Sequence, residues 1–141
     1  MAKDKPDHHD AEIVLKLYEL RRETVMRESR SAMIGKFWPK SYEEFLAVTK
    51  FDHPMNAAFR QVSSYWEMVY SFGKHEIVNV DFLAENSGEG MLLFAKFAPY
   101  LERFRKEVSP TAFQNAEWMT KASEVAKQRF SMMKMRVEQH K

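Results

Sequence analysis

Apolar residues recur at three- and four-residue spacing along most of the chain, the pattern of amphipathic α-helices. The first stretch predicts a helix over residues 10–33, capped by Asp7 or Asp10 through side-chain bonds to free N–H groups. Gly35 can adopt the left-handed conformation that ends many helices, so we expect the helix to stop there. The apolar positions that carry this prediction are Ile13, Val14, Leu17, Leu20 and Val25.

The middle of the chain predicts two further long helices and two short ones. Residues 54–73 carry a wide apolar face beside one polar stripe, and residues 89–107 space their phenylalanines as a helix would. Ser41 followed by Glu44 has the order of a capping box, which predicts a short helix over 42–49. A second short helix is expected at 81–85. The polar stripe consists of Asn56, Arg60, Ser63, Glu67, Ser71 and Lys74.

The clearest periodicity lies at the C-terminal end. Ser109-Pro110 is a typical helix start, and no residue after it predicts a stop, so one helix is expected over 110–139. Its small and apolar residues form a heptad seam suited to a neighbouring helix. The pattern leaves open whether that neighbour belongs to the same chain or to another. The seam comprises Ala112, Ala116, Met119, Ser123, Ala126, Phe130, Met133 and Val137.

These elements predict an all-α fold, an antiparallel bundle of four main helices with two short connecting helices. The 141 residues suit one domain, residues 1–141, with a polar N-terminal leader over 1–9. No apolar run is long enough to span a bilayer, and no secretory signal is expected from the charged start. Because the chain has no cysteine, it forms no disulfide or thiolate site, and we expect it in the cytoplasm.

Charge and motifs argue against nucleic-acid and cofactor binding. The net charge is only +2, and the arginines between 21 and 30 are interleaved with glutamates that can pair with them. The one Gly-x-Gly, at 88–90, has no third glycine, and no P-loop is present. Asp7-His8-His9-Asp10 could hold a metal, but a capping role suits it better, and no Glu-x-x-His pair occurs. We therefore expect no cofactor and no metal.

Isolated side chains on the predicted helix over 54–73, and just after it, could still form an enzyme site in three dimensions. Tyr65, Tyr70, His75 and Glu67 are the candidates, although Glu67 falls on the polar stripe and is better read as solvated. His53 and His75 suit helix termini. No spacing demands catalysis, so no catalytic residue is predicted.

Large apolar side chains outside the expected core indicate contact with a partner. Met132 and Met135 lie off the heptad seam, where a second helix face or a partner could cover them. Phe37 and Trp38 occupy a connection between helices, where they either fasten the loop to the core, which we favour, or anchor a partner.

Three functions remain compatible with the sequence. We favour a non-enzymatic interaction module, either an assembly subunit with a protein partner or a homo-oligomer. The alternatives are a bundle that binds or senses a small hydrophobic ligand, and an enzyme without a recognisable motif.

Overall fold

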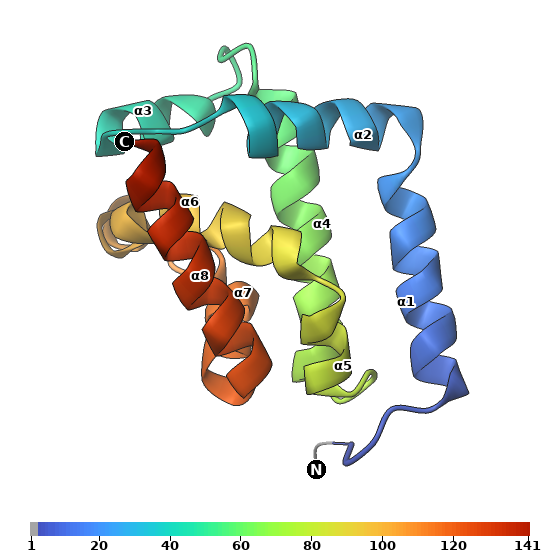
Figure 1. The fold of residues 1–141 in the computed structure, drawn as a ribbon. Coiled ribbons are helices and arrows are strands. Elements are labelled where there is room, and N and C mark those ends of the chain that lie inside the picture. Colours follow the sequence, from blue (N-terminus) through green and yellow to red (C-terminus); the bar gives the residue numbers. More distant parts are fainter. Residues whose placement is uncertain (1–2) are drawn as a thin grey trace.

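The computed structural model describes residues 3–141, and this part of the chain is helical without any β-strand (Figure 1), which confirms the all-α prediction. No helix in it is long and apolar enough to cross a membrane. In chain order the helices are α1 (His8–Arg21), α2 (Thr24–Arg30), the π-helix η1 (Ser31–Lys36), α3 (Tyr42–Val48), α4 (Asn56–Lys74), α5 (Val80–Glu85), α6 (Gly88–Glu107), α7 (Gln114–Ala122) and α8 (Glu124–His140).

The continuous first helix predicted over 10–33 is wrong, because the chain breaks at Glu23. Glu23 has an extended backbone, and its carboxylate accepts a hydrogen bond from the Met26 N–H at 2.9 Å, so it caps a new helix, α2. Asp7 caps α1 as predicted. Gly35 is not a left-handed stop, since no glycine among residues 3–141 has positive φ and Gly35 lies inside η1. The chain therefore turns at Glu23, where one continuous rod was expected.

The central helices agree with the pattern of the sequence. Ser41 caps α3 by accepting a hydrogen bond from the Glu44 N–H at 3.1 Å, and α4 buries the wide apolar face predicted for it. Asn56, assigned to the polar stripe, is buried at the start of α4, where its amide donates to the Val48 carbonyl at 2.9 Å. Asn79 caps the short helix α5.

The prediction of a single C-terminal helix over 110–139 is also wrong. Phe113 has a φ of 57°, in the left-handed region, and α7 begins only after it. The chain then breaks at Ser123, whose hydroxyl donates to Asp81 at 2.7 Å and accepts from the Ala126 N–H at 3.2 Å. Ser123 therefore caps α8, and its bond to the segment of α5 fixes the break.

The heptad seam nevertheless faces the interior of the same chain. Ala116, Met119, Ser123 and Ala126 are buried, and the Phe130 ring lies 4.9 Å from the Phe94 ring of α6, centroid to centroid. The seam therefore meets helices of the same chain, with its α8 part on α6 and its α7 part mainly on α4.

Packing follows several directions rather than one bundle axis. α6 packs on α8, and α4 packs on both α2 and α7. Figure 1 shows α2 running crosswise to α1 and α4, so the antiparallel four-helix arrangement is not confirmed. The centre of the core is aromatic, with the Phe45 and Phe97 rings 4.9 Å apart and Phe104 edge-on to Phe45 at 5.1 Å.

Candidate groove between α6, α8 and residues 38–40

A large open groove lies between α6, α8 and the extended residues 38–40. Its volume is about 1070 Å³, and its lining is mainly apolar. α6 supplies the floor, and α8 supplies one wall from Phe130 to Lys141, while Trp38 begins the other wall. The lining side chains that the following argument uses are Trp38, Lys40, Lys96, Lys134, Met135 and His140.

Trp38 lies between two basic groups at one end of the groove. The Lys96 Nζ is 3.7 Å from the indole centroid, and the His140 ring stacks on the same indole at 3.7 Å with an interplanar angle of 9°. Two groups this close to one ring cannot share a face, so they occupy opposite faces. The stack therefore fastens the end of α8 to the 38–40 segment and to α6.

Lys96 also closes the end of the π-helix η1. Its Nζ donates to the carbonyl oxygens of Met33, Ile34 and Phe37 at 2.8, 2.7 and 2.9 Å. The Trp38 indole N–H donates to the Gly35 carbonyl at 3.1 Å. Carbonyls at a helix end have no partner within the helix, so these two side chains replace the missing backbone donors.

Opposing effects act on the charge of Lys96. Burial lowers its pKa to about 7, and the nearby charge of Arg136 acts in the same direction. The three carbonyl oxygens and the indole face stabilise the ammonium form. The lysine is 2% exposed, and all three of its N–H donors are occupied when it is protonated. It is therefore a structural group of the groove, and in the protonated state it has no free lone pair for nucleophilic attack.

The four predicted partner contacts lie in different places. Trp38 and Met135 both line the groove, and Met135 is 64% exposed. Met132 is similarly exposed, at 62%, but does not line it. Phe37 is buried against the rings of Phe97 and His53, so it fastens the loop to the core and is not available to a partner.

Sequence reasoning missed Lys96 and His140 as groove residues. Lys96 is the single charged residue within the apolar run from Met91 to Ala98, and its interior position is the one local signal. A lysine placed inside an otherwise buried helix segment must find oxygen acceptors or an aromatic face. His140 carries no comparable signal, because its role depends on the end of α8 reaching Trp38.

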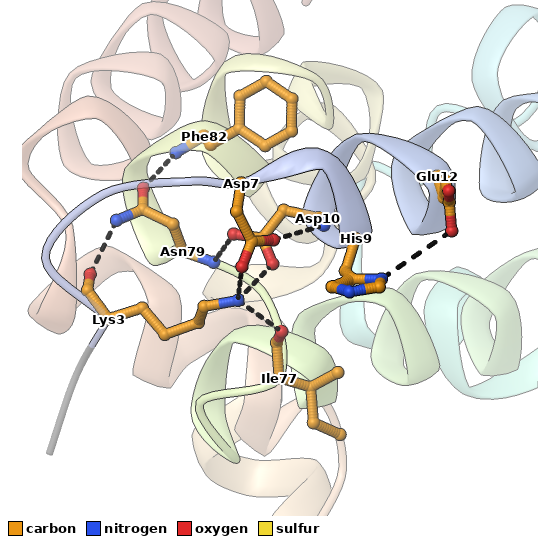
Figure 2. A network of polar contacts seen from close by, with 8 residues as sticks. All are labelled: Lys3, Asp7, His9, Asp10, Glu12, Ile77, Asn79 and Phe82. Atoms are coloured by element: carbon orange, nitrogen blue, oxygen red, sulfur yellow. Dashed lines mark hydrogen bonds and ion pairs between the residues drawn. The ribbon is translucent and has the colours of Figure 1, made fainter.

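The Asp7-His8-His9-Asp10 cluster has a structural role, because it helps to hold the N-terminal segment against the rest of the fold. Asp10 is fully buried, and its carboxylate accepts from Lys3 Nζ at 2.5 Å and from the Asn79 N–H at 3.1 Å (Figure 2). The Asn79 amide donates to the Lys3 carbonyl at 2.7 Å, which closes a ring of polar contacts. Residues 3–7 of the predicted leader are thereby tied to the start of α5, and the structure describes nothing of residues 1–2. Within residues 3–141 no group of three or more histidine and acidic side chains could hold a metal.

The side chains considered for an enzyme site are not brought together. The Tyr65 hydroxyl donates to the Leu17 carbonyl, and the Tyr70 hydroxyl donates to the Ser87 carbonyl at 2.7 Å. Burial raises the pKa of both phenols. His75 is exposed at the end of α4. The two tyrosine hydroxyls therefore serve separate structural contacts.

Glu67 is not the solvated residue expected from the polar stripe. Its carboxylate accepts from the backbone N–H groups of Asn115 and Ala116 at 3.0 and 2.8 Å, and so caps α7 from another helix. Burial raises its pKa, while these two hydrogen bonds oppose the rise. It borders a smaller cavity of about 400 Å³, which contains no second titratable acid. This arrangement explains Glu67 as a helix cap.

Comparison with known families assigns the chain. Residues 6–123 match the family described as Domain of unknown function (DUF4760). The chain belongs to the DUF4760 family. Searches of curated proteins and of solved structures find no match. The DUF4760 match includes Trp38 and Lys96 but ends at Ser123, so α8, with Met135 and His140, lies beyond the part that matches. The groove thus combines a floor from the DUF4760 region with a wall from the helix that follows it.

Proposed function

We propose that this protein is a non-enzymatic interaction module whose groove binds a helical segment of a partner protein. The observation that carries the proposal is the apolar groove of about 1070 Å³, with Trp38 on one wall and the exposed Met135 on the other. Methionine adapts its shape to varied apolar partners. Trp38 fixes its wall in place, because Lys96 and His140 cover the two faces of its indole.

The dimensions of the groove favour a helix. The α8 wall from Phe130 to Lys141 comprises about three helical turns, or roughly 17 Å at 1.5 Å per residue. Most of its lining residues are exposed, so a small molecule would remain largely in water, whereas a helix can lay one apolar face along the whole wall.

Selection from a displayed library of random peptides of about three helical turns tests the proposal. We expect enrichment of peptides with apolar residues at helical spacing, and loss of their binding by more than about tenfold in Met135→Glu. Met132→Glu is the matched control, because Met132 is equally exposed on the same helix but lies outside the groove. Enriched peptides that bind both variants equally well would refute the proposal.

Self-association through α1 is a second candidate, favoured by an outer apolar face. Leu15 and Tyr18, one helical turn apart, are 63% and 53% exposed. Light scattering over a range of concentrations tests it, with Leu15→Glu expected to return any dimer to a monomer. A monomer at every concentration refutes this candidate and leaves the groove proposal intact.

A small hydrophobic ligand is the remaining alternative, since the groove volume lies near the upper end for ligand sites. A thermal-shift screen with apolar compounds distinguishes this alternative. A compound that stabilises the wild-type protein but not Met135→Glu would favour a small ligand over a peptide.

We propose the cytoplasm as the location of the protein, and cell fractionation tests this.

A further inference from the structure

The groove concentrates positive charge. Its lining includes four lysines, Lys40, Lys96, Lys134 and Lys141, against one acid, Glu138. Glu138 already pairs with Lys141 at 3.0 Å. Burial lowers the pKa of Lys96 to about 7, so the positive charge of the groove comes mainly from Lys40 and Lys134.

Two of these lysines have no acidic partner. Among residues 3–141 neither Lys40 nor Lys134 forms an ion pair, and both are exposed. Lys40 belongs to the 38–40 wall, whereas Lys134 belongs to α8, where its Nζ lies 5.1 Å from the Phe130 ring. A positive group therefore stands on each wall, with the apolar floor between them.

We propose that the groove binds an acidic amphipathic helix of a partner protein. Its apolar face would lie on the floor supplied by α6 and on Met135, and carboxylates on its two flanks would pair with Lys40 and Lys134. This inference rests on the proposed function and adds the charge of the partner.

The chemistry of the groove distinguishes this partner from other anions. A nucleic acid backbone presents phosphates without an apolar face of helical shape, and it would leave the floor uncovered. An acidic amphipathic helix would cover the apolar floor and pair with the lysine on each wall at the same time. Because the two lysines are exposed, the charge pairs contribute mainly to specificity and to the rate of association, and salt screens them.

The library selection described above also tests this inference, through the charge of the enriched peptides. We expect them to carry aspartate and glutamate on the flanks of the apolar face. Enrichment of neutral or basic helices with the same Met135 dependence would overturn the inference and keep the proposed function. A failure to enrich any peptide that depends on Met135 would overturn both.

Charge reversal provides the second measurement, made by fluorescence anisotropy on a synthetic copy of one enriched peptide. The double variant Lys40→Glu and Lys134→Glu should bind it about tenfold more weakly. Lys127→Glu is the control, since Lys127 is exposed on the same helix but does not line the groove. Added sodium chloride should weaken the wild-type complex and strengthen that of the double variant, because it screens attraction in the first and repulsion in the second. Equal affinities for the double variant and the control would overturn the inference.

Discussion

Replacing Lys96 by methionine tests whether its buried amino group, which donates hydrogen bonds to the end of η1, holds the groove together. Methionine keeps the unbranched chain but donates no hydrogen bond, so the carbonyls of Met33, Ile34 and Phe37 lose the donor that now lies within 2.9 Å of each. A buried carbonyl without a partner costs about 1–3 kcal/mol. We therefore expect Lys96→Met to lower the free energy of unfolding by about 3–5 kcal/mol at pH 7, which urea unfolding followed by circular dichroism measures.

The pH dependence of that loss is a sharper test. Burial lowers the pKa of Lys96 from 10.5 to about 7 in the folded chain, so between these values the unfolded chain binds the additional proton. The contribution of Lys96 to stability is then full above about pH 10.5 and declines as the pH falls to about 7, by at most about 1.4 kcal/mol per pH unit. Below pH 7 both states are protonated and the contribution is constant.

The wild-type protein should therefore gain stability over Lys96→Met as the pH rises from 7 to 9, by up to about 3 kcal/mol. Comparison of the two proteins at each pH cancels the titration of other groups. Lys127→Met, an exposed lysine on α8, should match the wild type at both values. A loss below about 1 kcal/mol in Lys96→Met, or one that does not change with pH, would refute the reasoning.

Three further substitutions test contacts elsewhere in the fold, each by urea unfolding. Asp10→Asn should lower the free energy of unfolding by about 3 kcal/mol, because it removes the charged acceptor from a buried network, and an unchanged value would show that the network adds nothing. Glu67→Ala should cost about 1–2 kcal/mol through the lost cap of α7, whereas a stability equal to the wild type would contradict that role. Gly90→Ala should cost more than about 2 kcal/mol, because its new Cβ would lie 2.2 Å from the Tyr70 hydroxyl, while Gly35→Ala meets nothing within 4 Å and should be neutral or stabilising.

The sequence predicted correctly those helix features that are determined by residues close together in the chain. The Ser41 cap and the apolar face of α4 arise from residues within one or two turns, so their pattern is visible in the sequence. The break at Glu23 was missed because glutamate is a less common N-cap than serine or aspartate. The break at Ser123 depends on Asp81, which is distant in the chain, so the heptad pattern indicated the correct buried face but the wrong length.

The groove could be predicted only in part. The position of Met135 off the seam indicated an exposed side chain, and the position of Trp38 between helices suggested either a loop fastened to the core, which we favoured, or a partner contact. The stack of Lys96, Trp38 and His140 joins α6, a loop and the end of α8, and no periodicity relates these positions. Residues brought together by tertiary packing leave no spacing rule in the sequence.

The position of His140 on Trp38 has a consequence for synthesis on the ribosome. Translation makes the 38–40 segment and α6 before α8, so a nascent chain without α8 displays the indole face of Trp38 and the floor of α6 without the α8 wall. The groove therefore cannot form until α8 has been made. Ribosome-bound chains that lack α8 should therefore fail to bind any peptide selected by the finished protein.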